Sequence, residues 1–540
     1  MVSTEQPLDA FLSPLDVDAA KIHKLAKSLA STFTRLAKES KNQFLSTPIS
    51  EEVLRFEGDV DGQYLAIDIG GTNLRVGFIE LLSLPHPQSE ASDLNGKAST
   101  DAGSNPQPSV QRHLEKSWPI GEQLKNNKAE DLFAWIGTCI AEIVREGCRI
   151  WDGKLPDQIP LGVTFSFPMI QHTLSKATLM SMGKGFAITS NLDLGKLLLE
   201  GYESVRDPSL PRIRITAIVN DAVATLVSFA YQFRSNARRK AAMAVIVGTG
   251  CNATIPLALN KLHPSKRPTD LKVLDDRAPS EDLKITVNTE WSINGTAVPL
   301  KELNFITYWD TILDSQGEVP GFQPFEYMTA GRYLGELGRL IILDYFTNHL
   351  HIPISSLPAK LLIRHGITTT FLGNLGPHLS NIEPSMLRQL ESELPSQDGE
   401  GAWQWTQEAA EIVFKISKAI QVRAAGMAAA AIIGLLACAD EVDFTCLPVH
   451  SPRQNGNTAP MPISPANQVE ELMVGYTGGC IVHFQDYLED CQRFLDVIMD
   501  VEFAGSKVPR VLLTPCHDGG IIGAGILAGT VMGIMNDTST

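Results

Sequence analysis

Apolar residues along this chain fall into short runs that predict strands and longer periodic stretches that predict helices. Amphipathic spacing predicts helices at 16–39 and 129–147, and helical composition also marks 326–345 and an alanine-rich stretch, 405–437. Strand-like runs occupy 64–69, 75–79, 113–120, 161–168, 214–219 and 244–250. Two stretches rich in proline and small polar residues predict surface insertions at 84–112 and 448–468.

The stretch 64–80 predicts a β-hairpin with a glycine turn. One apolar strand reaches Asp68, and a second strand begins at Arg75. A carboxylate at the end of a buried strand, beside two glycines, suits a metal–phosphate site, because glycine amides can approach an anion closely and the carboxylate can hold Mg²⁺ through water. An ordinary glycine-rich hairpin with a capping aspartate is the alternative, and this stretch alone leaves both open. The turn consists of Gly70, Gly71, Thr72 and Asn73.

The composition is typical of a globular protein, with 44% hydrophobic and 20% charged residues. A chain of 540 residues can form two or more domains with sizeable cores. The net charge of -16 disfavours nucleic acid or an anionic membrane as the main partner. Eight scattered cysteines without a CxxC pair predict free thiols in a reducing compartment. We see no secretory signal or membrane-spanning run and expect a cytoplasmic protein.

Polar residues follow two further strands. Ser166 stands near the end of the run 161–168, where ligands gather in α/β sheets. Asn220 and Asp221 follow the run 214–219. A carboxylate in this position can accept the proton of a hydroxyl that attacks a phosphate. It could also cap the helix that follows, and the two roles are compatible.

A second glycine turn, Gly248-Thr249-Gly250, follows the apolar run that starts at Ala244. It repeats the pattern of the first hairpin, an apolar strand followed by a glycine turn. Such a duplication suits two similar halves that close on ATP. Further along, Glu290 and Glu326, with Gln323, offer hydrogen-bond acceptors of the kind that a polyol needs, although acidic residues in loops are often only solvated surface charges. Near the C-terminus, Asp518, Gly519 and Gly520 open a helix whose amides can seat a nucleotide.

In this order, the elements resemble those of the eukaryotic hexokinase family. The resemblance is carried by LAIDIGGTNLRV around Asp68, LGVTFSFP around Ser166, Lys184-Gly-Phe, Val-Asn-Asp at 219–221 and Asp-Gly-Gly at 518–520. It implies an α/β protein with two actin-like domains and a deep cleft that closes on its ligands and excludes water. It places a small domain at 62–214 with the C-terminal helix 524–540, and a large domain at 215–523 with the N-terminal region 1–61.

The resemblance also implies roles for single residues. Asp221 is expected to orient and deprotonate a sugar 6-hydroxyl, Lys184 to neutralise the transferring phosphoryl group, and Asp68 to hold Mg²⁺ through water. Sugar contacts are expected from Ser166, Lys184, Asn220, Asp221, Asn252, Glu290, Gln323 and Glu326. ATP contacts are expected from Asp68, Gly70, Gly71, Thr72, Asn73, Gly248, Thr249, Gly250, Gly478, Asp518, Gly519 and Gly520. The expected partners are ATP and a sugar, without direct nucleic-acid binding or membrane insertion, for a monomer or homodimer.

Two segments depart from the family pattern. Met182-Gly183 stands where the family has Trp-Thr, and Thr477 and Gly479 replace an aspartate and a serine near the ATP. A roomier wall beside Lys184 could admit an N-acetyl group, so the sequence favours N-acetylglucosamine as the substrate and looks like fungal kinases for that sugar. Glucose kinase is one alternative. A non-catalytic, hexokinase-like regulator is another, which the changed ATP elements favour and the retained Asp68, Lys184 and Asp221 disfavour.

Overall fold

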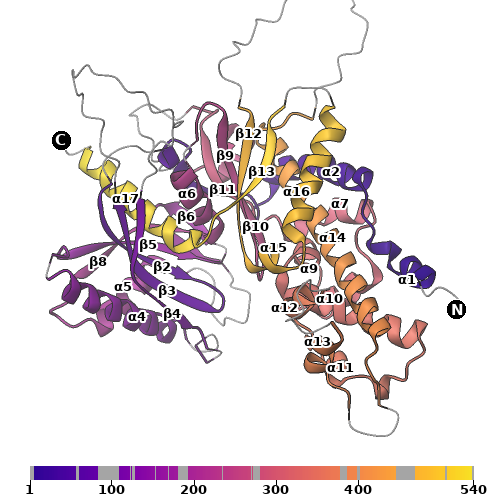
Figure 1. Cartoon of the computed structure of the whole chain (residues 1–540). Helices are drawn as coiled ribbons and strands as arrows, with labels where there is room; N and C mark the ends of the chain where they lie inside the picture. The colour runs from indigo at the N-terminus through magenta and orange to yellow at the C-terminus, as the bar shows by residue number, and fades with distance from the viewer. Residues whose placement is uncertain are drawn as a thin grey trace, which may run out of the picture. The chain divides into compact units, whose positions relative to one another are not determined.

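The computed structural model describes residues 5–537 apart from 56–59, 83–108, 122, 125–127, 153, 168, 181–191, 234, 269–270, 272–279, 377–385, 398–401, 445–468 and 505–507 (Figure 1). Contacts group the chain into two compact units. Unit 1 comprises Met1–Phe44, Ala237–Ile255 and Thr289–Pro515, and unit 2 comprises Leu45–Asn236, Pro256–Asn288 and Cys516–Thr540. The prediction places 45–61, 215–236, 256–288 and 516–523 in the large domain, whereas these residues group with unit 2. Within unit 2, for example, helix α6 (Asp221–Phe233) packs against the C-terminal helix α17 (Gly519–Asp537).

Unit 2 is built on a five-stranded sheet in the order β4-β3-β2-β5-β8. The strands β4, β3 and β2 pair antiparallel, and β2, β5 and β8 run parallel, so the ends of these three strands share one edge. The predicted hairpin at 64–80 is therefore present as β2 and β3. The strands are β2 (Gly62–Ile69), β3 (Asn73–Leu82), β4 (Ser109–Pro119), β5 (Gln158–Phe165) and β8 (Arg212–Val219), and β6 (Met169–Thr173) pairs separately with β7 (Lys176–Leu179).

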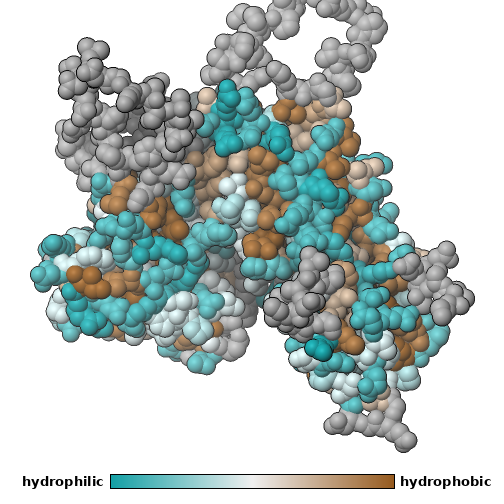
Figure 2. All heavy atoms as spheres, viewed as in Figure 1, coloured by the Kyte–Doolittle hydropathy of each residue, from teal (hydrophilic) through white to brown (hydrophobic). Residues whose placement is uncertain are grey.

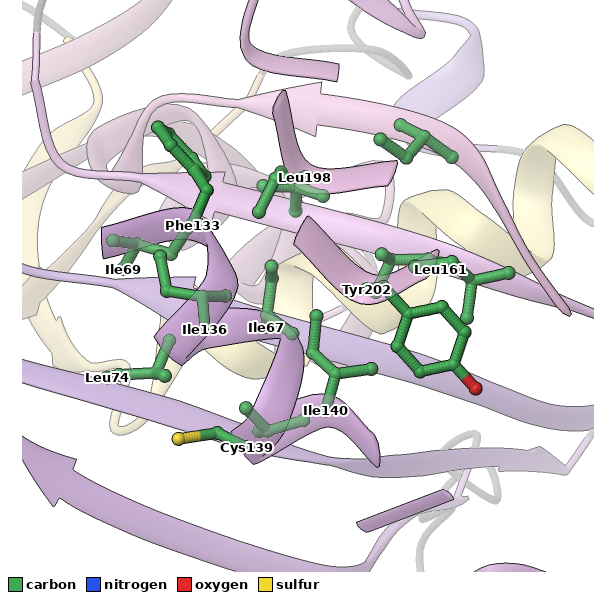
Figure 3. Packing of buried hydrophobic residues seen from close by; sticks show 14 of the residues in the cluster. Ile67, Ile69, Leu74, Phe133, Ile136, Cys139, Ile140, Leu161, Leu198 and Tyr202 are labelled. Atoms are coloured by element: carbon green, nitrogen blue, oxygen red, sulfur yellow. The ribbon is translucent and has the colours of Figure 1, made fainter. Parts of the chain in front are cut away.

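Helices cover both faces of this sheet (Figure 1). On one face, α4 (Ala129–Ile150) and α5 (Leu194–Val205) enclose the apolar core shown in Figure 3, where side chains of α4 such as Phe133, Ile136 and Ile140 lie against side chains of β2 and β5. These two helices approach closely at Gly137, where a Cβ would lie 2.3 Å from the carbonyl oxygen of Gly201.

The opposite face carries α17 (Gly519–Asp537), which also packs against α6 (Asp221–Phe233). The helix can approach because β5 has a glycine there: a Cβ on Gly162 would lie 1.9 Å from the carbonyl oxygen of Ala524. The start of α17 also lies close to the first turns of α6, since a Cβ on Gly519 would lie 2.8 Å from the Cα of Thr225.

The second sheet has six strands in the order β1-β11-β10-β9-β12-β13. Its last four strands repeat the pattern of the first sheet, because β10 and β9 form an antiparallel pair and β9, β12 and β13 run parallel. The duplication inferred from the two glycine turns is thus visible in the strand order. The strands are β1 (Leu45–Ser50), β9 (Arg239–Val247), β10 (Cys251–Ala258), β11 (Lys284–Asn288), β12 (Glu471–Thr477) and β13 (Arg510–Pro515).

Most of unit 1 is helical, and its longest helix is almost entirely internal. By length and composition this helix, α14 (Gln407–Cys438), could span a membrane. However, 89% of its most apolar stretch is buried within the protein, as expected of a core helix. On the face seen in Figure 2, apolar residues are interspersed with hydrophilic ones. The helices are α1 (Glu5–Leu12), α2 (Ala19–Glu39), α7 (Ala297–Glu302), α8 (Tyr308–Ser315), α9 (Pro324–Thr329), α10 (Gly331–Asp344), α11 (Ala359–Leu362), α12 (Thr369–Asn374), α13 (Met386–Glu393), α14 (Gln407–Cys438), α15 (Gly479–His483) and α16 (Tyr487–Phe503).

Three of the four predicted helices are confirmed, as α2, α4 and α14. The helix predicted at 326–345 is instead two helices, α9 and α10, because Ala330 is extended (φ -105°, ψ 148°). The insertions predicted at 84–112 and 448–468 lie outside the described residues, except that β4 already begins at Ser109.

Candidate functional site

The first candidate site residue, Asp68, lies near the end of β2 and is nearly buried. Its partner across the hairpin is Arg75, which donates a hydrogen bond of 2.6 Å from Nη2 to the Asp68 Oδ2. The turn that follows Asp68 is closed by the amide of Gly70, which donates to the carbonyl oxygen of Asn73 at 2.9 Å. Thr72 and Asn73 are exposed. The hairpin therefore places a charged pair directly beside an open glycine turn.

The C-terminal glycine segment meets this hairpin within unit 2. Arg75 donates from its other nitrogen, Nη1, to the Asp518 Oδ1 at 2.7 Å, and Arg112 on β4 donates to the Asp518 Oδ2 at 2.7 Å. Gly520 lies against Asp68, because a Cβ there would lie 2.6 Å from the Asp68 Oδ2. Two elements that the sequence assigns to ATP, more than 400 residues apart, thus share one arginine.

Asp221 is the first residue of α6, and only Asn220 separates it from the end of β8. The Asn220 side chain caps the helix, because its Oδ1 accepts the amide hydrogen of Ala222 at 2.9 Å. The Asp221 Oδ1 accepts from the same amide at 2.8 Å, and the carboxylate is partly exposed. Ser166 follows β5, and its amide donates to the carbonyl oxygen of Ile69. Three parallel strands therefore deliver these candidate residues to one sheet edge.

Electrostatics links the carboxylates of unit 2. Burial raises the pKa of Asp68, the guanidinium of Arg75 opposes this rise, and the charges of Asp221 and Asp518 add to it. The three carboxylates therefore repel one another with only partial compensation. A cation bound here would relieve that repulsion.

The second glycine turn, in unit 1, is held by the start of α10. Gly331 and Arg332 donate their amide hydrogens to the carbonyl oxygens of Gly248 and Thr249, at 2.8 and 3.1 Å. Gly248 also donates to the carbonyl oxygen of Gly250. The break at Ala330 creates the helix end that supplies these amides.

Gly478 follows β12 beside this turn and has φ +116°, a conformation that favours glycine. A Cβ there would lie 2.3 Å from the carbonyl oxygen of Val247. Glycine is therefore required at this position, both because of the positive φ and because the neighbouring strand β9 leaves no room for a Cβ.

The candidate sugar contacts of unit 1 are held in place by several hydrogen bonds. The Glu326 Oε2 accepts from the Cys251 amide at 3.2 Å and from the Ser292 hydroxyl at 3.3 Å. The Asn252 side-chain amide lies 3.4 Å from the Glu290 Oε1. Gly250 leaves room for the carboxylate, since a Cβ there would lie 3.0 Å from the Glu326 Oε2.

Two further candidate sugar contacts, Glu290 and Gln323, are also held by hydrogen bonds. Glu290 has φ 46°, an unfavourable backbone conformation for a residue with a side chain, and the Gln43 side chain holds its carbonyl oxygen at 2.9 Å. Gln323 accepts a hydrogen bond from the Tyr333 hydroxyl at 3.3 Å. Strained residues of this kind concentrate at functional sites.

The structure describes every predicted site residue except Lys184, which lies outside the described part together with Met182 and Gly183. It also identifies Arg75 and Ser292 beside the predicted site residues, and the sequence reasoning missed both. Arg75 could have been found from its position across the hairpin from Asp68. Ser292 bonds to Glu326, which lies 34 residues further along the chain, and it left no local signal.

The donor set of unit 2 fits a hydrated magnesium ion. Within the described residues, no three Asp, Glu, His or Cys side chains gather closely enough to hold a metal ion directly. Mg²⁺ commonly keeps several waters and uses one or two carboxylates together with phosphate oxygens. A single carboxylate such as Asp68, with the carboxylates of Asp221 and Asp518 near it, suits that mode of binding.

Family comparisons match most of the chain. One family model described as hexokinase matches residues 242–530, which is more than half of the chain, and a second hexokinase model matches residues 7–231. Hexokinase-1 of Schizosaccharomyces pombe is 30% identical over 296 residues, covering 54% of this chain and 50% of the relative. Hexokinase-1 of Nicotiana tabacum is 26% identical over 493 residues, covering 89% of this chain and 82% of the relative. The first relatives are thus matched over about half of their own length.

Among solved structures, the hexokinase from Schistosoma mansoni complexed with glucose superposes with a TM-score of 0.70 at 23% identity, covering 97% of this chain and 98% of that one. A second hexokinase crystal structure gives a TM-score of 0.67 at 22% identity, covering 98% and 99%. These similarities show the actin-like ATPase fold of the hexokinases, and the strand order of both sheets agrees with it. Because a hexokinase family model spans more than half of its length, the chain belongs to the hexokinase family.

Proposed function

We propose that this protein is an ATP-dependent sugar kinase that phosphorylates the 6-hydroxyl of a hexose or N-acetylhexosamine. The observation that carries the proposal is the position of Asp221. It begins α6 at the edge where β2, β5 and β8 end, near enough to Asp68 for its charge to raise the pKa of that carboxyl. A general base and a phosphate-binding element belong together in phosphoryl transfer.

The proposed mechanism gives each unit its own task. In unit 2, Asp221 orients the sugar hydroxyl and accepts its proton, with Asn220 fixing the start of α6 beneath it. The turn at Gly70 and Gly71 lies beside the phosphates, with the Gly70 amide closing the turn onto the Asn73 carbonyl oxygen. In unit 1, the carboxylates of Glu290 and Glu326 accept hydrogen bonds from other sugar hydroxyls, and the fixed backbone at Gly250 and Cys251 keeps Glu326 in place.

Magnesium bound with ATP would neutralise charge that develops on the phosphoryl oxygens. We propose that Asp68 holds it through water. Lys184, from the sequence resemblance, would provide a second positive charge at the transferred group.

Two candidate substrates remain, each favoured by a different observation. Met182-Gly183 in place of Trp-Thr favours N-acetylglucosamine, because the smaller pair leaves room for an N-acetyl group. The relatives favour glucose, since they are named hexokinases and one solved relative is complexed with glucose. We favour N-acetylglucosamine. For location we propose the cytoplasm, which the seven free cysteines of the described chain support.

The deciding experiment is a coupled ADP-release assay across hexoses and N-acetylhexosamines, with Mg²⁺ and ATP. We expect release that depends on the sugar and is largest with N-acetylglucosamine. Sugar binding without ADP release from any sugar would instead support the regulator alternative, which the replacements at Thr477 and Gly479 favour.

A further inference from the structure

Arg75 connects two elements that are each predicted to bind ATP. It lies opposite Asp68 in the register of β2 and β3, so the hairpin alone brings the two side chains together. Its two terminal nitrogens are divided between Asp68 and Asp518, at 2.6 and 2.7 Å. Charge-assisted hydrogen bonds this short are among the strongest polar contacts in proteins.

The contact leaves the Asp68 carboxylate with little freedom. Arg75 holds Oδ2 from one side, and Gly520 packs against the same oxygen from another. The Gly520 backbone is itself fixed, because its carbonyl oxygen accepts a hydrogen bond of 2.8 Å from the buried Thr164 hydroxyl. Within the described residues, no hydrogen bond reaches the other oxygen, Oδ1. Arg75 therefore holds the carboxylate through one oxygen and leaves the other without a hydrogen-bond partner there.

We propose that Arg75 is a positioning residue for the nucleotide. It holds one oxygen of Asp68 and ties the segment at Asp518 to the hairpin, so that the second oxygen of Asp68 can bind the water shell of magnesium. This inference rests on the proposed function. Arg75 itself need not contact the phosphates, because it acts through Asp68.

Arg112 provides a matched control. It makes an equally short contact with Asp518, at 2.7 Å, and a longer one with Glu115, at 3.3 Å, but it does not contact Asp68. Its loss removes a charge from the Asp518 segment while the pair between Arg75 and Asp68 stays intact. A purely structural role of the cluster would make the two arginines equivalent.

The test compares ADP binding with and without magnesium, by titration calorimetry, in the wild type, Arg75→Gln, Arg75→Lys and Arg112→Gln. The quantity of interest is the gain in affinity that magnesium provides. We expect Arg75→Gln to reduce this gain about tenfold, which equals about 1.4 kcal/mol of binding free energy. Arg75→Lys should recover part of it, since lysine restores the charge but cannot bridge two carboxylates as a planar fork does. Arg112→Gln should keep the wild-type gain.

An unchanged gain in Arg75→Gln, or an equal loss in Arg112→Gln, would overturn the inference. Thermal unfolding checks whether Arg75→Gln is folded. If it is not, the test uses Arg75→Lys, and the same magnesium-dependent gain in ADP affinity as in the wild type would then overturn the inference. The proposed function fails separately, when the wild type binds ADP but no sugar leads to ADP release. A wild type that binds no ADP overturns both.

Discussion

At the scale of single residues, the proposed mechanism depends most on Asp221. Its place is set by the end of β8 and the cap of α6, so an isosteric change at this position removes the base without disturbing either. We expect Asp221→Asn to lower kcat about 10²- to 10⁴-fold, the usual contribution of a general base. The change should leave the melting temperature and sugar affinity near wild type. Turnover close to wild type would exclude Asp221 as the base.

Sugar selection is predicted to depend on Met182 and Gly183. An N-acetyl group needs the space that a threonine and a rigid tryptophan would fill, whereas methionine adapts its shape. We expect Met182→Trp with Gly183→Thr to lower kcat/KM for N-acetylglucosamine relative to glucose by roughly 10- to 200-fold. The kcat/KM values for the two sugars are measured on one preparation, so that any change in ATP affinity cancels in their ratio. An unchanged ratio would mean that these positions do not select the sugar.

Gly478 and Gly479 offer a matched pair for testing backbone requirements. A Cβ on Gly478 would collide with the Val247 carbonyl oxygen, and φ +116° is strained for any side chain. We expect Gly478→Ala to lower the free energy of unfolding by more than about 1 kcal/mol. At Gly479 the nearest atom to a Cβ is 4.0 Å away, so Gly479→Ala should be close to neutral. Equal denaturation midpoints for the two variants would contradict this account.

The sequence predicted site residues whose partners are close in sequence and missed those whose partners are far away along the chain. Asp68 and its turn were predictable, because a strand, two glycines and a second strand are adjacent. The link from Arg75 to Asp518 spans 443 residues and leaves no trace in the local pattern. Ser292 was missed for a similar reason, since its role beside Glu326 depends on how a turn and helix α9 fold together.

At the scale of elements, the same distinction explains the break between α9 and α10. Helical composition runs through Ala330, so the sequence predicts one helix. The amides of Gly331 and Arg332 instead hold the carbonyl oxygens of Gly248 and Thr249, and these tertiary hydrogen bonds outweigh the local preference. By contrast, α2 was predicted well, because its buried face repeats with helical spacing from Ile22 to Leu36.

Packing of α2 against α16 includes a charged contact that makes unfolding depend on pH. Glu502 accepts from His23 at 2.6 Å and from Lys27 at 3.0 Å. Burial raises the pKa of Glu502, but these two hydrogen bonds and the charges of Lys27 and His23 outweigh it and hold the pKa below its usual range. A carboxyl whose pKa is lower in the folded state stabilises the fold above its unfolded pKa, near about 4.3, and this stability is lost as the pH falls through the folded pKa.

We therefore expect Glu502→Gln to reduce the free energy of unfolding by about 1 kcal/mol at pH 7, with a difference from wild type that shrinks below about pH 4.3. Urea unfolding at a series of pH values measures this. Asp500→Asn, which changes an exposed acid on the same helix, is the control and should show neither effect. A difference that stays constant down to pH 3 would mean that the Glu502 charge is not what stabilises the contact.

At the scale of the whole molecule, the sequence predicted the fold class and the duplicated core, because several motifs in a fixed order identify the family even where single motifs are weak. It could not predict which segments form each unit. The chain passes between the units several times, and residues 215–236 group with unit 2 through contacts of α6 with α17 that are far apart in sequence.

Ligand binding also raises the stability of the whole folded molecule. Measuring this rise with different sugars distinguishes the three candidate functions. A ligand that binds only the folded chain stabilises it by about 2.7 kcal/mol when present at 100 times its Kd. At equal concentrations, the sugar that binds more tightly therefore raises the melting temperature more. We expect N-acetylglucosamine to give a larger shift than glucose in scanning calorimetry, and the same sugar to give the larger ADP release. A larger shift and faster release with glucose would identify a glucose kinase, because binding and turnover would then agree on that substrate. A shift with either sugar, but no ADP release with any, would mean that the fold has kept its sugar site while Asp221 serves no chemistry.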